Sequence, residues 1–140
     1  MEKKKLILDV AIEANGPALE MIGETNSVFM IPFKGSVKSE IFNGIVEPCG
    51  VDTQTLNAVG VRHMSARYML TGKDAQGNDA HIYVENNGYF DEEHKSMPFK
   101  TIPTFYTDSP CLREYLQSNR FIGEGHMSEE EGLHILFFEI

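Results

Sequence analysis

The segment VRHMSARYML at residues 61–70 is followed by TGKDAQGND at residues 71–79 and by HIYVEN at residues 81–86. The first and third segments alternate apolar with polar side chains, and this period of two predicts β-strands that bury one face. The second segment is polar and contains glycine, which favours a turn. We therefore expect the two strands to form an antiparallel hairpin.

Comparable short segments recur along the chain and extend this prediction to the whole fold. They lie at residues 6–12, 27–33, 35–46, 51–56, 100–107, 120–125 and 133–140. Asn86-Asn87-Gly88 is expected to end the strand at residues 81–86, and Pro103 to mark an edge position or a bulge. Ser109 and Pro110 have the residue types of a helix cap and a first helical position, which predicts one short helix ending near residue 118.

The resulting pattern of about eight to ten strands, without regularly alternating helices, predicts an all-β fold. Closure into an antiparallel barrel is favoured over a sandwich because closure removes exposed strand edges. The length of 140 residues suits a single domain that covers residues 1–140.

The charge of the chain limits the partners that we expect. The formal net charge is −9, from 21 acidic and 12 basic residues. Nucleic acids and anionic membranes are bound through clustered Lys and Arg, so we expect neither as a partner. No apolar stretch is long enough for the core of a signal peptide or for a membrane span. Cys49 and Cys111 lack metal or redox spacing, and we expect reduced thiols in a cytoplasmic protein.

The common catalytic and cofactor motifs do not occur in the sequence. There is no phosphate-binding glycine loop, no dinucleotide fingerprint, no Gly-x-Ser-x-Gly motif and no His-Glu-x-x-His motif. The five histidines lack metal-ligand spacing, although a barrel could still bring His63, His81 and His134 together across its strands. We expect surface or half-buried imidazoles, no metal and no cofactor.

Five polar residues are candidates for binding a small-molecule ligand: Asp52, Gln54, Arg67, Tyr83 and Asn86. Asp52 and Gln54 share one face of a strand, and the other three belong to the hairpin. If they point inward, the buried guanidinium of Arg67 needs a carboxylate, and Asp52 is the natural candidate. Such a pair beside amides and a phenol would form a polar floor in an apolar cavity. The alternative is that Arg67 faces solvent and Asp52 lies in a turn, because a register shift of one residue reverses every face.

Several motifs resemble those of one bacterial and fungal family and occur in the same order. They are GVDTQ at 50–54, SARY at 65–68, AHIYVENNG at 80–88, KTIPTFYT at 100–107 and YLQSNRFIGEG at 115–125. Over residues 5–140 the chain is similar to the domain of unknown function 3237 family, also named uncharacterised protein family 0311. The resemblance implies a small antiparallel barrel of lipocalin-like or allene-oxide-cyclase-like shape and no established activity.

The candidate site residues other than Tyr83 match the pattern of this family. The chain differs from it at Thr53, where the family usually has an aromatic residue, and at Tyr115, where tryptophan is common. The connection at residues 72–79 is also longer than usual. These differences would reshape the wall of a pocket, so the ligand of a relative does not transfer to this chain.

Three functions agree with these observations. The first is binding of a small apolar or aromatic metabolite in a barrel pocket, supported by the aromatic residues Phe29, Phe105, Tyr106, Tyr115 and Phe121. The second is a cofactor-free isomerase, cyclase or lyase, in which Asp52 or Tyr83 acts as acid or base and Arg67 stabilises negative charge. The third is a non-catalytic interaction domain or homo-oligomer that presents part of the apolar segment at residues 133–140.

Overall fold

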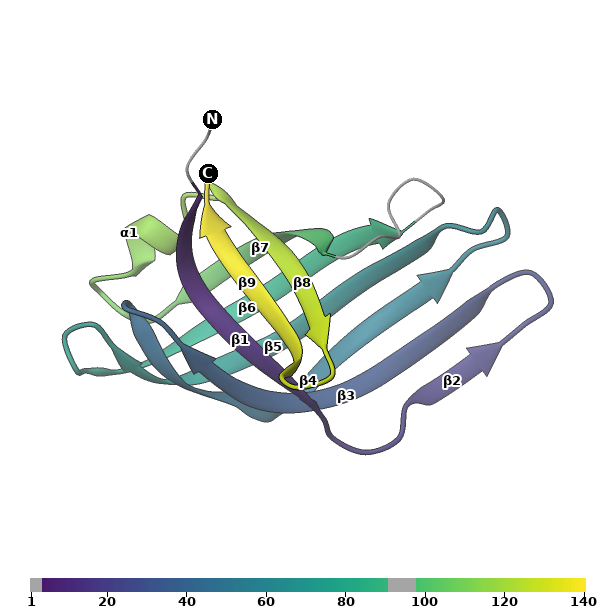
Figure 1. Cartoon of the computed structure of the whole chain (residues 1–140), viewed down its shortest axis with the longest axis horizontal. Helices are drawn as coiled ribbons and strands as arrows, with labels where there is room; N and C mark the ends of the chain where they lie inside the picture. The colour runs from purple at the N-terminus through teal and green to yellow at the C-terminus, as the bar shows by residue number, and fades with distance from the viewer. Residues whose placement is uncertain (1–3, 91–97) are drawn as a thin grey trace.

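Residues 4–90 and 98–140, which the computed structural model describes, form nine antiparallel strands and one short helix. The strands are β1 (Lys5–Ala14), β2 (Leu19–Ile22), β3 (Ser27–Lys38), β4 (Phe42–Leu56), β5 (Arg62–Asp74), β6 (Asp79–Phe90), β7 (Phe99–Thr107), β8 (Phe121–Ser128) and β9 (Gly132–Glu139). β1 pairs with β9 on one side and with β3 on the other, so every strand except β2 belongs to a closed barrel (Figure 1). The predicted all-β barrel is confirmed.

The predicted hairpin is confirmed as β5 and β6, which pair from Arg62 opposite Phe90 to Lys73 opposite Asp79. The carboxylate of Asp74 holds the turn, because its Oδ1 accepts hydrogen bonds from the backbone N–H groups of Gln76 and Asn78, both at 3.0 Å. This turn fixes the register of the hairpin and therefore decides which side chains of both strands face the interior.

Several predicted strand boundaries are wrong, and the gap expected between residues 46 and 51 lies inside β4. Residues 27–33 and 35–46 were expected as separate strands, but β3 runs on to Lys38 and bends at a bulge beside Gly35. A Cβ at Gly35 would lie 1.8 Å from the carbonyl oxygen of Ala11, so a larger residue would block the pairing of β1 with β3. The chain turns instead after Ser39, whose hydroxyl accepts the N–H groups of Ile41 and Phe42.

The turn predicted at Asn86-Asn87-Gly88 is also wrong, because all three residues lie inside β6. Asparagine and glycine favour turns locally, but here both neighbouring strands continue past them. Asn86 pairs with Ala66 on β5 and with Pro103 on β7. Pairing on both sides outweighs the local turn preference.

The predicted helix exists but is short. Helix α1 (Arg113–Leu116) is preceded by Leu112 at its N-cap position, without a side-chain cap. Ser109 does not act as the cap, because its hydroxyl donates to Asp74 Oδ2 at 2.9 Å. The side chains of Leu112 and Leu116 are buried in the core, so α1 packs its apolar face onto the barrel. No helix in the described part of the chain has the length and apolar character that crossing a bilayer requires.

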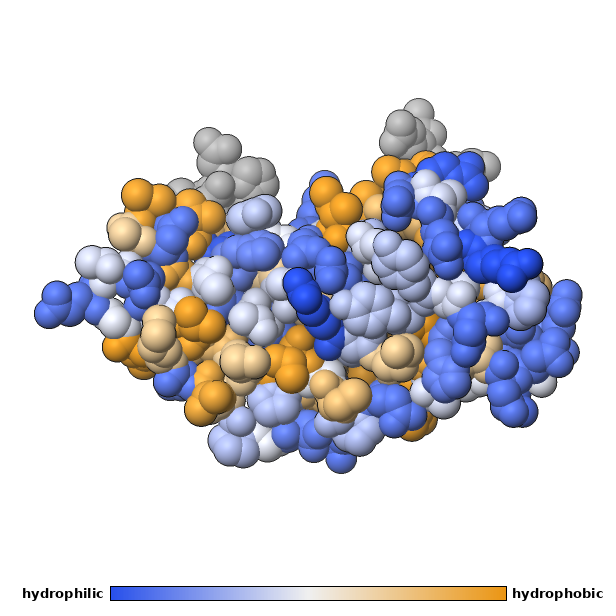
Figure 2. Space-filling view, turned by 180° about the vertical axis from the view of Figure 1, so that it is seen from behind, coloured by the Kyte–Doolittle hydropathy of each residue, from blue (hydrophilic) through white to orange (hydrophobic). Residues whose placement is uncertain are grey.

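The interior of the barrel is packed at one end and open at the other. Large side chains such as Phe105 and Phe137 fill the packed end, with their rings edge to face at 5.2 Å. Along the inner face of β5 the side chains change from Leu70 and Tyr68 to the smaller Ala66, beside which a cavity opens. On the outside, apolar and polar side chains are intermixed (Figure 2).

Candidate functional site

A cavity of about 160 Å³ lies inside the barrel, beyond the packed core. Its walls are mainly aromatic and aliphatic, with three polar side chains. The lining residues are Ile12, Phe33, Asp52, Gln54, Met64, Ala66, Tyr68, Asn86, Phe90, Phe99, Met127, Leu133 and Ile135. An apolar cavity of about 150 Å³ in another protein holds benzene, so this one has room for a single ring with small substituents.

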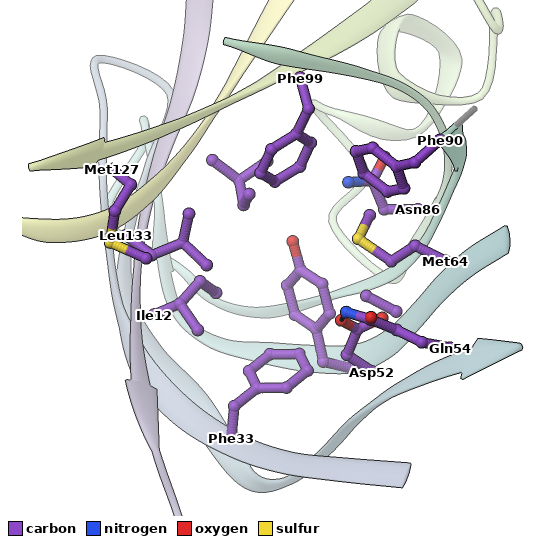
Figure 3. A pocket seen from close by; sticks show the side chains of 13 residues that line it. Ile12, Phe33, Asp52, Gln54, Met64, Asn86, Phe90, Phe99, Met127 and Leu133 are labelled. Atoms are coloured by element: carbon purple, nitrogen blue, oxygen red, sulfur yellow. Dashed lines mark hydrogen bonds between the residues drawn. The ribbon is translucent and has the colours of Figure 1, made fainter. Parts of the chain in front are cut away.

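The three polar side chains share one wall of the cavity with Met64 and Phe90, and the opposite wall is apolar. Asp52, Gln54 and Asn86 project from β4 and β6, whereas Ile12, Met127 and Leu133 face them from β1, β8 and β9 (Figure 3). A ligand in this cavity would therefore have one polar edge and one apolar edge.

The ring of Phe99 forms part of the cavity wall because a glycine lies opposite it. Phe99 on β7 pairs with Gly125 on β8, and a Cβ at Gly125 would lie 1.9 Å from the Phe99 ring. Phe90 meets Phe99 edge to face at a centroid distance of 5.3 Å. Gly125 thus leaves room for an aromatic corner that would contact a bound ring.

The polar wall is built on one cross-strand row. Asp52 on β4 is opposite Ala66 on β5, and Ala66 is opposite Asn86 on β6. Neighbouring strands lie about 4.8 Å apart, so the Cα atoms of Asp52 and Asn86 are separated by roughly 10 Å. Because the methyl group of Ala66 is small, it leaves a recess between the two polar side chains.

A chain of two hydrogen bonds connects Arg62 through Gln54 to the carboxyl of Asp52. Arg62 Nη1 donates to Gln54 Oε1 at 2.7 Å, and Gln54 Nε2 donates to Asp52 Oδ2 at 2.8 Å. The guanidinium of Arg62 also lies over the ring of Phe29, at 5.4 Å from its centroid. Burial raises the pKa of the Asp52 carboxyl, opposed by the hydrogen bond from Gln54 and by the charges of Arg62 and His63.

Three buried polar atoms of the lining side chains have no hydrogen-bond partner in the described part of the chain. They are Asp52 Oδ1, the hydroxyl of Tyr68 and Asn86 Oδ1. Burial raises the pKa of Tyr68 far above its ordinary value, so its phenol stays protonated. A buried polar atom without a partner costs about 1–3 kcal/mol. Three such atoms belong to residues that line one cavity, which makes this cavity the candidate site.

The structure brings together three of the five residues expected from the sequence. Asp52, Gln54 and Asn86 line the cavity. Arg67 and Tyr83 do not, because both lie on the outer face of the barrel beside Glu85. Arg67 Nε lies 3.4 Å from Glu85 Oε1, and 64% of the Arg67 side chain is exposed.

The expected ion pair between Arg67 and Asp52 is therefore wrong, and strand alternation gives the reason. Ala66 and Tyr68 take the inward positions of β5, which turns Arg67 outward. Tyr83 and Asn86 are three residues apart on one strand and so face opposite ways. Arg62 and Tyr68 were not predicted as residues of the candidate site. Both lie an even number of positions from the inward-facing Ala66 on β5, so strand alternation places them on the same face.

The alternative of a histidine metal site receives no support. His81 contacts Asp108 at 2.7 Å, His134 contacts Asp9 at 2.7 Å, and His63 stacks on Tyr89. Within residues 4–90 and 98–140, no three His, Cys, Asp or Glu side chains are grouped so that they could hold a metal ion.

The fold and the cavity define a class of protein: a closed antiparallel barrel with an internal cavity that is apolar on one wall and polar on the other. The model of a family of proteins of unknown function (DUF3237) matches residues 4–140, and the chain belongs to this family. The resemblance found in the sequence motifs is thereby confirmed.

Individual relatives agree with this assignment. A UPF0311 protein of Clostridium acetobutylicum is 33% identical over 122 residues, which cover 74% of this chain and 73% of that protein. The crystal structure of a protein of unknown function from the same organism has a TM-score of 0.76 at 28% identity and covers 99% of this chain and 98% of that chain. A β-barrel-like protein of Acinetobacter baumannii has a TM-score of 0.72 at 20% identity, covers 98% and 94% of the two chains, and supports the fold alone.

Proposed function

We propose that this protein binds a small, neutral and mainly apolar organic molecule inside the barrel. The observation that carries the proposal concerns three residues that line a mainly apolar cavity: Asp52, Tyr68 and Asn86 each have a buried polar atom without a partner among the described residues. A pocket with apolar walls and few converging polar groups is the usual arrangement of a small-molecule site. The volume of about 160 Å³ limits the ligand to about one ring.

The charge of the cavity wall favours a neutral ligand over an anion. Among the described residues that line the cavity there is no Lys, Arg or His. The nearby guanidinium of Arg62 already donates to Gln54. A carboxylate or phosphate would lose its hydration and lie close to the carboxyl of Asp52 without a cation to compensate.

A cavity-filling substitution tests binding without altering any polar group. Leu133→Trp places a large side chain in the cavity, and Ile102→Trp adds the same side chain at a position that is 69% exposed on the outside. We expect p-xylene to shift the backbone amide NMR signals of cavity residues in the wild type and in Ile102→Trp. Leu133→Trp should weaken the affinity at least about tenfold. Equal affinity in all three proteins would contradict the proposal.

A second candidate is a cofactor-free isomerase, cyclase or lyase that uses the same cavity. The observation that favours it is the environment of Asp52, which lines the cavity. Burial raises the pKa of its carboxyl, and one carboxyl oxygen has no partner among the described residues. A carboxyl with a raised pKa exchanges protons with a bound molecule more readily near neutral pH. Without an ion pair to Arg67, Asp52 is also a better proton donor than the sequence suggested.

Hydrogen exchange on a simple ketone tests this second candidate without knowledge of the substrate. We expect the protein to accelerate the exchange of the α-hydrogens of cyclohexanone with deuterated water, as followed by proton NMR. Asp52→Asn should remove the acceleration, whereas Asp79→Asn, on the exposed end of β6, should retain it. Identical rates with wild type, Asp52→Asn and buffer alone would exclude proton transfer by Asp52 to such ketones.

A further inference from the structure

The orientation of the Gln54 amide follows from the chemistry of Arg62. A guanidinium carries donors and no acceptor, so the atom of Gln54 that faces it must be the carbonyl oxygen. The amide nitrogen of Gln54 is therefore turned toward Asp52 and donates to Oδ2. With an N–H group directed at Oδ2, a proton on Asp52 can reside only on Oδ1.

Asp52 lines the cavity beside Ala66, and Asn86 stands on the opposite side of Ala66. Asp52 Oδ1 is buried and has no partner among the described residues. In the ionised carboxylate Oδ1 is an acceptor, and in the neutral acid it carries the proton and is a donor. Oδ1 is thus the atom of Asp52 that a ligand would contact.

We infer that the cavity takes a neutral single-ring molecule whose hydroxyl group lies over Ala66 and donates to Asp52 Oδ1, and that Arg62 is a positioning residue that keeps this oxygen free by orienting Gln54. The inference rests on the proposed function, which it narrows to hydroxyl-bearing rings. The ring of the ligand packs against the apolar wall of Ile12 and Leu133. The hydroxyl of Tyr68, also unpartnered, supplies a donor for the ligand oxygen.

The charged and titratable groups around Asp52 define how binding depends on pH. Arg62 and His63 on β5 act on its carboxyl from the strand next to β4, and Arg62 keeps its charge at all relevant pH values. Tyr68 on β5 stays neutral because burial raises its pKa. The facing residues on β3 and β6 are Phe33 and Asn86, and the far wall is apolar. His63→Gln removes the imidazole that acts on Asp52 and serves as a control.

Three probes of equal heavy-atom number separate the possible interactions: p-cresol can donate, benzaldehyde can only accept, and p-xylene can do neither. Above the pKa of Asp52 we expect wild type to bind p-cresol about tenfold more tightly than p-xylene, because the hydroxyl donates to an ionised carboxylate. As pH falls through the pKa of Asp52, p-cresol should lose affinity and benzaldehyde should gain it. The affinity of p-xylene should not change, and His63→Gln should behave as wild type.

Variants at both ends of the hydrogen-bond chain test the role of Arg62. In Asp52→Asn, Gln54 still presents its N–H group, so the new amide must direct its oxygen to Gln54 and its NH₂ group into the cavity. This variant should prefer benzaldehyde over p-cresol at every pH. Combining Asp52→Asn with Arg62→Met frees the Gln54 amide to rotate, so the preference for benzaldehyde should fall severalfold. Combining Asp52→Asn with Arg62→Lys should preserve most of the preference for benzaldehyde.

Calorimetric or NMR titrations with these probes distinguish the failure of the inference from the failure of the proposed function. If p-xylene and both polar probes all fail to bind wild type, the proposed function is wrong. If p-xylene binds but p-cresol has no advantage and no pH dependence, the cavity binds apolar rings and the inference is overturned. The third outcome concerns Arg62. If the affinities for p-cresol and benzaldehyde respond to pH as expected, but Asp52→Asn alone and Asp52→Asn combined with Arg62→Met prefer benzaldehyde equally, the assigned role of Arg62 is wrong.

Discussion

Two aspartates of this barrel are held in contrasting ways. Asp74 accepts hydrogen bonds from the N–H groups of Gln76 and Asn78 through Oδ1 and from the hydroxyl of Ser109 through Oδ2. Asp52 accepts one hydrogen bond, from Gln54, and its Oδ1 has no partner among the described residues. The hydrogen bonds to Asp74, of which that from Asn78 is the strongest cause, lower its pKa, whereas burial raises the pKa of Asp52.

The difference separates a structural carboxylate from one available to a ligand. Both carboxylate oxygens of Asp74 accept hydrogen bonds that connect the β5–β6 turn to the segment before α1. Asp74 therefore has no oxygen available to bind a ligand. One oxygen of Asp52 accepts a hydrogen bond from Gln54, while the other has no partner among the described residues. A buried polar atom that the fold leaves unsatisfied is costly, and the ligand that we propose would satisfy it.

The largest expected effect concerns the structural member of the pair. Asp74→Ala removes the acceptor for two backbone N–H groups and for Ser109, so the midpoint of thermal unfolding should fall by several degrees. Asp79→Ala removes an exposed carboxylate that contacts Lys73 in the same turn, and its midpoint should stay close to that of the wild type. If the two variants unfold at the same temperature, the structural role of Asp74 is refuted.

A smaller loss is expected at the partner of Asp74. The hydroxyl of Ser109 is buried, and Ser109→Ala leaves Asp74 Oδ2 without this donor. The free energy of unfolding, measured with urea, should fall by about 1–2 kcal/mol. The pKa of Asp74 should rise at the same time. Ser118→Ala, at an exposed position, should change the stability by less than about 0.5 kcal/mol.

Asp52 should affect stability in the opposite direction. Because its pKa is raised above the value of 3.8 for a free side chain, the folded state holds the proton more tightly than the unfolded state. Ionisation of Asp52 therefore lowers the stability of the folded state. This loss is complete at pH values above the pKa of the folded state, and it is absent at pH values below the pKa of the unfolded state. Asp52→Asn should be at least as stable as the wild type above the folded pKa of Asp52, and any advantage should vanish in acid. An advantage that grows in acid would contradict the raised pKa.

The smallest expected effect is a change in the pKa of one group. Gln54→Leu removes the hydrogen bond that opposes the effect of burial on Asp52, so the pKa of Asp52 should rise further. The pKa of Asp74 should not change, because Gln54 makes no contact with it. Carbon-detected NMR titration of the side-chain carboxyls measures both, and a lower pKa for Asp52 in the variant would be the contrary result.

The sequence was sufficient for the fold class, the β5–β6 hairpin and the shared face of Asp52 and Gln54, because each depends on local alternation. The sequence was insufficient to predict the face of the barrel on which the Arg67 side chain lies. Its apolar neighbours suggested burial, but the register that the Asp74 turn imposes places Ala66 inward and Arg67 outward. The strand boundary near Gly35 also depended on contact with another strand, which no local pattern records.

The sequence alone could have placed Arg62 on the same face as Ala66, because the two residues lie four positions apart on one strand and side chains alternate between faces. The partner of its guanidinium could not be predicted in this way, because Gln54 is brought to it by the pairing of β4 with β5. Similarly, the unsatisfied oxygen of Asp52 is a property of the assembled wall. Which atoms remain without partners depends on every neighbouring strand, and this information appears only in three dimensions.

The central claim is that Asp52 Oδ1 is held free for the hydroxyl group of a ligand. The most direct test is to measure the pKa values of Asp52 and Asp74 by carbon-detected NMR, without ligand and with saturating p-cresol. We predict a pKa for Asp52 above that of an ordinary carboxyl, which falls when p-cresol binds because the hydroxyl donates to the ionised form. Asp74 should stay below the ordinary value in both states. A pKa for Asp52 that is at or below the ordinary value and does not move on p-cresol binding would contradict the account.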